Sequence, residues 1–308
     1  MTRTKVLYIA TAGRSGSTLL EQALGSLPGW CSLGELNWVW SRGIVDNVRC
    51  GCGERFHDCR FWQGVLEAGF GGIEPVVAAA LDTQWRDHRI AANLPMLASR
   101  AARERARAGR HQATDVLATV YRAAAAESDA RVVVDSSKIP LRPAFLHGRQ
   151  DIDIFVLQLV RDPRGVGFSW LRTKVGEDRT SLERSTVTKA AVWWMVTNEI
   201  ISRTAADAGD NLAVLRYEDL VADPRAALTR IGDLVGEPLD LDRLVQSGEL
   251  TLSTTHAVSG NPDRFRTGTV PLRPDDGWRT AMPRRKRLVA TAITAPLLRR
   301  FGYPLCSD

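Results

Sequence analysis

One stretch near the start of the chain constrains its fold more than any other. It begins with a short apolar run, residues 6–10 (VLYIA), whose β-branched side chains predict a buried strand. Gly13 and Gly16 then predict a turn, and leucines and alanines at helical spacing from Leu19 to Leu27 predict a helix. The stretch therefore predicts a strand, a glycine-containing loop and a helix in direct succession.

The loop of this unit has the composition of an anion-binding turn. Glycine lets backbone N–H groups approach a ligand closely, and Ser15, Ser17 and Thr18 add hydroxyl donors. Arg14 adds a cation, and the N-terminus of the following helix carries the positive end of the helix dipole. These features favour a bound phosphate. The alternative is an ordinary turn between a strand and a helix.

The loop lacks the lysine of the common nucleoside-triphosphate loops. In those loops the last glycine is followed by Lys and then Ser or Thr, whereas here Gly16 is followed directly by Ser17. The cation is Arg14, whose planar guanidinium matches a fork of phosphate oxygens. The missing lysine disfavours a small-molecule kinase with a variant loop, and it leaves a magnesium ion without an evident ligand.

Three more apolar runs predict strands that alternate with helices. The runs lie at residues 131–135, 153–160 and 211–216. This order predicts an α/β fold, with a P-loop-like parallel β-sheet flanked by helices on both faces. Ligands of such sheets bind beyond the carboxyl ends of the strands, so polar residues there predict one shared site. Those residues are Gly13–Thr18, Asp135–Lys138, Arg161–Ser169 and Tyr217–Asp219.

Other segments give coarser predictions. Residues 75–127 are rich in Ala, Arg and Leu and predict two or three helices that form a helical insertion or lid. Residues 25–62 contain many glycines and aromatic residues and predict a long irregular loop or wall. A long helix is predicted at residues 188–207. Its predicted inward side chains are Val192, Trp193, Val196, Ile200 and Ile201.

Composition and charge narrow the range of partners. The chain has 308 residues, 44% of them hydrophobic, and we expect residues 1–308 to form a single domain. A net charge of +6, spread along the chain, fits a small anionic ligand, and we expect no nucleic-acid partner. Because a strand begins at once and no apolar run is long enough to span a bilayer, we expect a cytoplasmic protein without a transmembrane segment. Homo-oligomerisation stays open.

A cluster of cysteines lies early in the chain. Cys50, Cys52 and Cys59, with His57 nearby, have ligand types that bind zinc. Their spacing is not that of a standard zinc motif. We therefore favour a reduced or locally bridged thiol cluster without metal, and the sequence leaves the alternatives open.

Five motifs together resemble one known family, the sulfotransferases that use 3′-phosphoadenosine 5′-phosphosulfate (PAPS). They follow the family's order and cover most of the chain. The fifth is more similar to bacterial and carbohydrate-type members than to the cytosolic aryl type. The motifs are residues 13–18 (GRSGST), 134–138 (VDSSK), 159–164 (LVRDPR) with Ser169, 216–220 (RYEDL) and 256–266 (HAVSGNPDRFR).

The resemblance implies a binding role for each motif. The first loop would hold the 5′-phosphosulfate, through Arg14, Ser15, Gly16, Ser17 and Thr18. Two residues of the third motif, Arg161 and Ser169, would hold the 3′-phosphate, and Tyr217 would lie beside the adenine. The last motif would close over the nucleotide, through Asn261, Arg264 and Arg266.

The resemblance also implies the chemistry, which moves a sulfuryl group to a hydroxyl of a small-molecule, carbohydrate or lipid-linked acceptor. Arg14 and Lys138 would stabilise the negative charge that grows on the departing phosphate. Glu35 occupies the place of the general base, and His57 and His256 are its rivals. We assign His57 to the cysteines and His256 to the late loop.

This chemistry does not require a metal, unlike phosphoryl transfer with magnesium. The remaining alternative is a non-catalytic nucleotide-binding protein. The presence of the cationic side chains and of the base disfavours it. These residues are Arg14, Lys138, Arg161 and Glu35.

Overall fold

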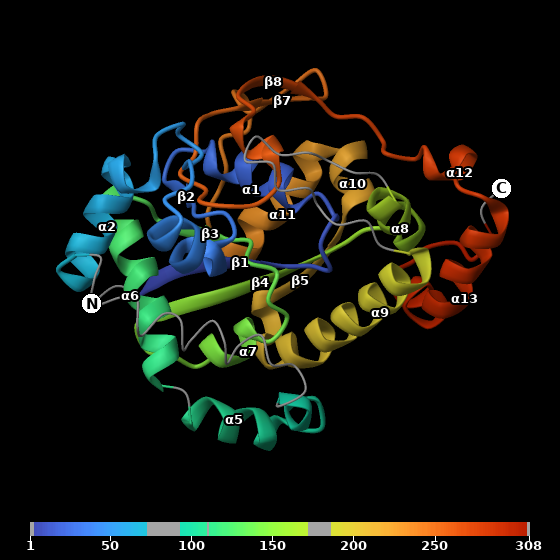
Figure 1. The fold of residues 1–308 in the computed structure, drawn as a ribbon, viewed down its shortest axis with the longest axis horizontal. Helices are drawn as coiled ribbons and strands as arrows, with labels where there is room; N and C mark the ends of the chain where they lie inside the picture. The colour runs from blue at the N-terminus through green and yellow to red at the C-terminus, as the bar shows by residue number, and fades with distance from the viewer. Residues whose placement is uncertain (1–2, 73–92, 110, 172–185, 307–308) are drawn as a thin grey trace.

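A parallel five-stranded sheet forms the centre of the protein in a computed structural model, which describes residues 3–72, 93–109, 111–171 and 186–306 (Figure 1). The strand order is β2-β3-β1-β4-β5, and every neighbouring pair is parallel. The predicted α/β fold class is therefore confirmed. The strands are β1 (Thr4–Ala10), β2 (Trp30–Ser32), β3 (Val132–Asp135), β4 (Ile152–Val160) and β5 (Leu212–Arg216).

Four of these strands lie where the apolar runs predict them, and β2 was missed. It contains only three residues and lies within the segment predicted to be irregular. Three residues are too short for an alternating pattern, and β2 forms because Trp30, Cys31 and Ser32 pair with β3.

Helices cover both faces of the sheet because the strands are apolar on both sides. Leu7 and Ile9 of β1 belong to the core under α1 (Ser17–Gly25) and α11 (Pro224–Val235). The alternate residues Val6 and Tyr8 belong to the core of the opposite face. The helices of that second core are α2 (Arg60–Phe70), α6 (His111–Ser128) and α9 (Val187–Thr204).

The segment predicted to form a helical insertion or lid is only partly described. Residues 73–92 lie outside the described residues. The described part contains α5 (Arg100–Ala108), which lies away from the sheet in Figure 1, and α6. Because Leu117, Val120 and Tyr121 of α6 are buried in the core of the sheet, α6 is one of the layers of the fold and not a lid.

The long helix α9 forms as predicted, but part of its predicted inward face was wrong. Val192, Trp193 and Val196 are between 39% and 46% exposed. The helix packs through Ala191, Trp194, Thr197 and Ile201 instead, since it lies against α8 (Pro163–Leu171) and α13 (Arg284–Arg300) as well as β4. Apolar side chains at helical spacing exist on two faces of α9, and the pattern alone does not choose between them.

A second, antiparallel sheet and several short helices complete the described structure. The sheet has three strands in the order β6-β7-β8, and its strands β7 and β8 lie above α1 in Figure 1. Among the described helices, none combines the length and the apolar character that a bilayer span requires. The remaining elements are α7 (Arg142–Leu146), α10 (Tyr217–Ala222), β6 (Val245–Gln246), β7 (Glu249–Leu252), β8 (Gly268–Pro271) and α12 (Trp278–Ala281), with short turns of helix at Leu36–Trp38, Val39–Val45, Phe56–Asp58, Leu94–Leu97, Ala205–Asn211 and Pro262–Phe265.

Candidate active site

A cavity of about 620 Å³ lies beyond the carboxyl ends of β1, β3, β4 and β5. This volume is within the range of cofactor and small-ligand sites. All the residues predicted to bind or react lie along its wall, except Ser15 and Arg264. Those along the wall are Arg14, Gly16, Ser17, Thr18, Glu35, Lys138, Arg161, Ser169, Tyr217, Asn261 and Arg266.

The loop after β1 has a left-handed backbone at three positions, with φ values of 35° at Gly13, 61° at Arg14 and 84° at Gly16. Gly16 immediately precedes the first residue of α1, so the loop leads directly into the N-terminus of that helix. A Cβ atom on Gly16 would lie 2.4 Å from the ring of Tyr217. Position 16 therefore requires glycine for both its backbone and its contact with this ring.

Arg14 joins two of the predicted binding residues. Its Nε donates to Ser169 Oγ at 3.0 Å, and its backbone oxygen accepts from Arg161 Nη1 at 3.1 Å. The loop after β1 is thereby tied to the end of β4 and to α8. Arg14 is 147 residues from Arg161 and 155 from Ser169 in sequence, and the parallel sheet brings them together because β1 and β4 are neighbours.

Arg161 lies between an aromatic ring and a carboxylate. Its guanidinium carbon is 4.7 Å from the centre of the Tyr217 ring. Its Nη2 lies 2.8 Å from Asp275 Oδ2 and also donates to the backbone oxygen of Asp275 at 3.2 Å. Arg161 is 6% exposed, so its fork is held in one place at the wall of the cavity.

Glu35 and Lys138 form an ion pair on the opposite side of the first loop. Lys138 Nζ lies 2.5 Å from Glu35 Oε1, and Trp38 Nε1 donates to Glu35 Oε2 at 3.1 Å. Both oxygens of the carboxylate therefore have a donor, and the pair still lines the cavity. A carboxylate and an ammonium group side by side provide one proton acceptor and one cation for a reaction in the cavity.

Buried hydrogen bonds hold the loop that carries Lys138. Asp135, at the end of β3, accepts from the backbone N–H of Ser137 at 2.7 Å and from the hydroxyl of Tyr121 at 2.6 Å. Arg142 Nη1 donates to Ser137 Oγ at 2.9 Å. Lys138 has a positive φ of 59°, and this network fixes the direction in which its backbone leaves the strand.

Two predicted binding residues do not line the cavity. The hydroxyl of Ser15 donates to the backbone oxygen of Gly13 at 3.4 Å, so it turns into its own loop. The guanidinium of Arg264 packs 4.2 Å from the centre of the Phe265 ring, and its Nη2 donates to the backbone oxygen of Arg49 at 3.2 Å. The late loop instead contributes Asn261 and Arg266 to the wall.

The chain matches one family in its sequence. The family model described as "Sulfotransferase family" matches residues 7–241. The chain belongs to the sulfotransferase family. No curated protein matches this sulfotransferase in sequence.

Two solved structures share the fold of this sulfotransferase. One is the sulfotransferase domain from the Synechococcus PCC 7002 olefin synthase, with a TM-score of 0.55 and 20% identity, covering 99% of this chain and 96% of that one. The other is the sulfotransferase domain from the curacin biosynthetic pathway, with a TM-score of 0.54 and 17% identity, covering 99% of both chains. At 20% and 17% identity, these two structures support the fold of this chain alone.

The sequence missed several side chains at the cavity of the sulfotransferase. Trp38 contacts Glu35, Asp275 contacts Arg161, and Arg42 Nη1 donates to Ser259 Oγ at 3.1 Å. The Arg42 guanidinium also lies 4.5 Å from the centre of the Trp38 ring. Trp38 and Arg42 come from the aromatic segment predicted to form a wall, but no sequence motif singled them out.

Glu21 of α1 is buried under the site, with 1% of its surface exposed. Burial is the largest effect on this carboxyl group and raises its pKa from 4.5 to about 8, although the hydroxyl of Ser136 donates to it and Lys138 lowers the value. Glu21 is therefore protonated in the folded protein at neutral pH. It links α1 to the loop after β3 without adding a second negative charge beside Glu35.

Replacing this acid should change how stability depends on pH. Because the pKa of Glu21 is raised in the folded state, folding stability falls as pH rises from about 4.5 to about 8. In Glu21→Gln the side chain stays neutral, so we expect a gain on the order of 2 kcal/mol, or about 4 °C in Tm, near pH 8.5. Melting curves across this pH range measure the difference. Parallel curves for the wild type and the variant would contradict the assignment, and Glu67→Gln, which alters an exposed carboxylate, is the control.

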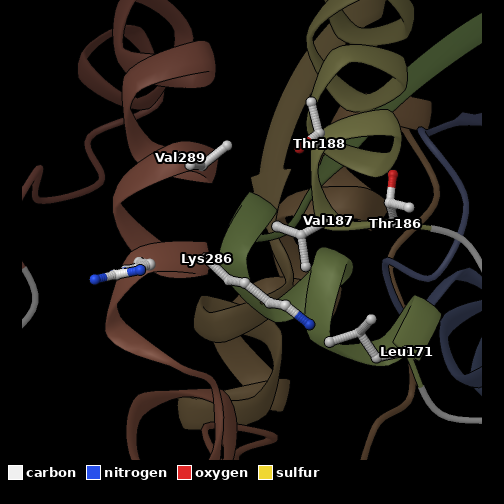
Figure 2. A pocket seen from close by; sticks show the side chains of 7 residues that line it. Leu171, Thr186, Val187, Thr188, Lys286 and Val289 are labelled. Atoms are coloured by element: carbon white, nitrogen blue, oxygen red, sulfur yellow. The ribbon is translucent and has the colours of Figure 1, made fainter.

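A second pocket of about 430 Å³ lies between α8, α9 and α13 (Figure 2). Lys286 extends from α13 across it, opposite Leu171 and Val187. The described residues along its wall are cations and apolar or hydroxyl side chains, and none of them is a carboxylate or an imidazole. The cavity at the strand ends is the candidate active site because the predicted binding and reacting residues gather there.

Proposed function

We propose that this sulfotransferase uses PAPS as the sulfuryl donor and a hydroxyl group as the acceptor, with Glu35 as the general base. One observation carries the proposal: the Arg14 loop, the Arg161–Ser169 pair and the Glu35–Lys138 pair line a single cavity. The resemblance of these motifs to PAPS-dependent enzymes supports the donor.

The charge of the cavity fits a donor with several anionic groups. Among the described residues along its wall, the cations outnumber the carboxylates, which favours an anionic ligand over a neutral one. The cations are Arg14, Arg42, Lys138, Arg161, Arg266 and Arg273, and the carboxylates are Glu35, Asp263 and Asp275. The ring of Tyr217, which packs on Gly16, provides an aromatic face for a base.

The residues divide the reaction between two ends of the cavity. When bound, PAPS supplies a sulfuryl group on a phosphate oxygen; the bond from sulfur to that oxygen breaks while a bond forms to the acceptor oxygen. Arg14 and the backbone N–H groups at the start of α1 stabilise the charge on the departing phosphate. Lys138 lines the same cavity and adds a second cation for the departing phosphate. Glu35, its partner in the ion pair, takes the proton from the hydroxyl group of the acceptor through Oε1 or Oε2.

Nucleotide binding tests the donor directly. The product adenosine 3′,5′-bisphosphate (PAP) should raise Tm and bind in calorimetry, because binding to the folded state stabilises it. Adenosine triphosphate with Mg²⁺ should do neither to a comparable extent. Stabilisation by the triphosphate but not by PAP would favour the alternative of a small-molecule kinase and contradict the proposal. A transfer screen with radiolabelled PAPS over small-molecule extracts then identifies the acceptor.

Removing the carboxylate beside Arg161 should tighten PAP binding. Asp275 Oδ2 lies 2.8 Å from Arg161 Nη2, where it competes with a 3′-phosphate for the same fork. We expect Asp275→Asn to increase the affinity for PAP about threefold to tenfold. The affinity for adenosine 5′-phosphosulfate, which lacks the 3′-phosphate, should not change. Calorimetry with both nucleotides measures this, with the exposed neighbour variant Asp276→Asn as the control; an equal change for both ligands would contradict it.

A further inference from the structure

Four side chains with soft or nitrogen ligand atoms converge outside the active-site cavity. The sulfur atoms of Cys50, Cys52 and Cys59 and a ring nitrogen of His256 all lie within 4.8 Å of one another. The cysteines come from the loop before α2, and His256 comes from the segment after β7. His57, which the sequence placed with the cysteines, is not part of the group, because its Nε2 lies 2.9 Å from the backbone oxygen of Ile44.

The spacing of these atoms matches the edges of a metal-centred tetrahedron. With Zn–S near 2.3 Å and Zn–N near 2.05 Å, a tetrahedral site has S···S edges of about 3.8 Å and S···N edges of about 3.6 Å. Cys59 Sγ lies 3.7 Å from both Cys50 Sγ and Cys52 Sγ. His256 Nδ1 lies 3.4 Å from Cys59 Sγ and 3.8 Å from Cys50 Sγ.

The same distances disfavour a disulfide between these cysteines. A disulfide bond is about 2.05 Å long, and the cysteines are free. A disulfide would also use only two of the three thiols and would leave His256 without a role. A four-ligand site uses every side chain of the group.

Neighbouring groups orient and stabilise the ligand atoms. Cys50 N donates to the backbone oxygen of Glu54 at 2.8 Å, and Gly53 N donates to that of Cys50 at 2.9 Å, which fixes the tight turn that carries Cys50 and Cys52. The ring of Phe61 stacks on His256 with centroids 4.5 Å apart and planes 15° apart, which fixes the imidazole.

Burial of the group favours a structural site. Cys50 and Cys59 are 0% and 1% exposed, whereas Cys52 and His256 are partly exposed and leave a path for an ion. None of the four lines the active-site cavity. Four protein ligands also close the coordination sphere, which is typical of structural zinc and leaves no position for a substrate.

We propose that Cys50, Cys52, Cys59 and His256 bind one Zn²⁺ as a closed structural site. On binding, the three thiols release their protons to solvent and His256 coordinates through Nδ1, with its remaining proton on Nε2. The ion therefore replaces protons, and no oxidation occurs.

The zinc site fastens two segments that are far apart in the sequence. Gly51 N donates to the backbone oxygen of Ala257 at 2.8 Å, and Trp62 Nε1 donates to that of His256 at 2.9 Å. In Figure 1 the loop after β2 and the segment after β7 run beside each other there. The segment continues to Ser259 and Asn261, which line the cavity. The metal therefore fixes one wall of the active site without taking part in the reaction.

Metal analysis of the full chain tests the proposal, and its outcome does not depend on the proposed donor. Protein purified without chelators should contain about one zinc per chain by elemental mass spectrometry. Cys59→Ser and His256→Gln should lose most of it. The matched controls His57→Gln and Cys306→Ser, which alter a neighbouring histidine and an exposed cysteine outside the group, should retain it.

A second measurement covers variants that fail to fold. Replacing the metal of the wild-type protein with Co²⁺ should give the visible absorption of a tetrahedral site and thiolate-to-cobalt charge transfer. Removing the metal with a chelator should lower Tm, and zinc should restore it. Protein without zinc, a disulfide within the group by mass spectrometry, or loss of zinc in His57→Gln but not in His256→Gln would overturn the proposal.

Discussion

Replacing Glu35 by glutamine should lower kcat by about 10²–10⁴-fold, because the acceptor hydroxyl loses its general base. Glutamine keeps the shape of the side chain and can still accept from Trp38 Nε1, which lies 3.1 Å from the wild-type carboxylate. PAP binding should be retained, since Lys138 and Arg14 stay in place. Initial rates with a hydroxyl acceptor, together with calorimetry, measure the two effects separately.

The control for this variant is Glu67→Gln, which removes an exposed carboxylate of α2 that does not line the cavity. It should have wild-type rates. Wild-type turnover in Glu35→Gln would remove Glu35 from the mechanism. If PAP binding is lost in parallel with the rate, the role of Glu35 is instead to hold Lys138, its partner in the ion pair, in place.

The Arg161→Ala substitution should weaken PAP binding by about 10- to 100-fold, the effect of losing hydrogen bonds between a fixed cation and a phosphate. Arg161 is held by the Arg14 backbone oxygen and the Tyr217 ring, so its fork is already oriented. Adenosine 5′-phosphosulfate should lose much less affinity because it has no 3′-phosphate. Titration of both nucleotides measures the ratio.

Two further variants separate binding from folding. Arg161→Lys keeps the charge but loses the planar fork, so it should bind PAP with intermediate affinity. Arg225→Ala removes an exposed arginine of α11 that pairs with Asp242 and should bind like the wild type. Equal losses for both nucleotides in Arg161→Ala, with an unchanged Tm, would contradict the 3′-phosphate assignment.

The sequence predicted the parts of the site that the sheet itself positions. Arg14, Lys138, Arg161 and Tyr217 follow β1, β3, β4 and β5, and parallel strands place their carboxyl ends at one edge. The apolar runs determine the strands, and the strands determine where these side chains meet. This reasoning needs no knowledge of the loops.

Contacts that depend on the path of long loops could not be predicted. Trp38 reaches Glu35, and Asp275 reaches Arg161, 114 residues earlier in the chain. His256 lies 197 residues from Cys59 in sequence, whereas His57 is two residues away and turns elsewhere. Nearness in sequence favoured the wrong histidine because it carries no information on how a loop folds back.

The prediction of which α9 side chains face inward was partly wrong for a different reason. Val192 and Trp193 are as apolar as the buried Trp194, so hydrophobicity alone did not distinguish the faces. The packing of α13 against α9 determines which face of α9 is buried, and α13 lies about a hundred residues further along the chain.

The close approach of Tyr217 to Gly16 has a consequence for engineering this enzyme. Because the ring lies where a methyl group on residue 16 would project, the first loop and the end of β5 cannot be redesigned one at a time. A smaller side chain at position 217 would also loosen the turn at Gly16, because the Tyr217 ring packs against it. If the cavity binds PAPS as proposed, variants with altered nucleotide preference are best sought in libraries that change both positions together.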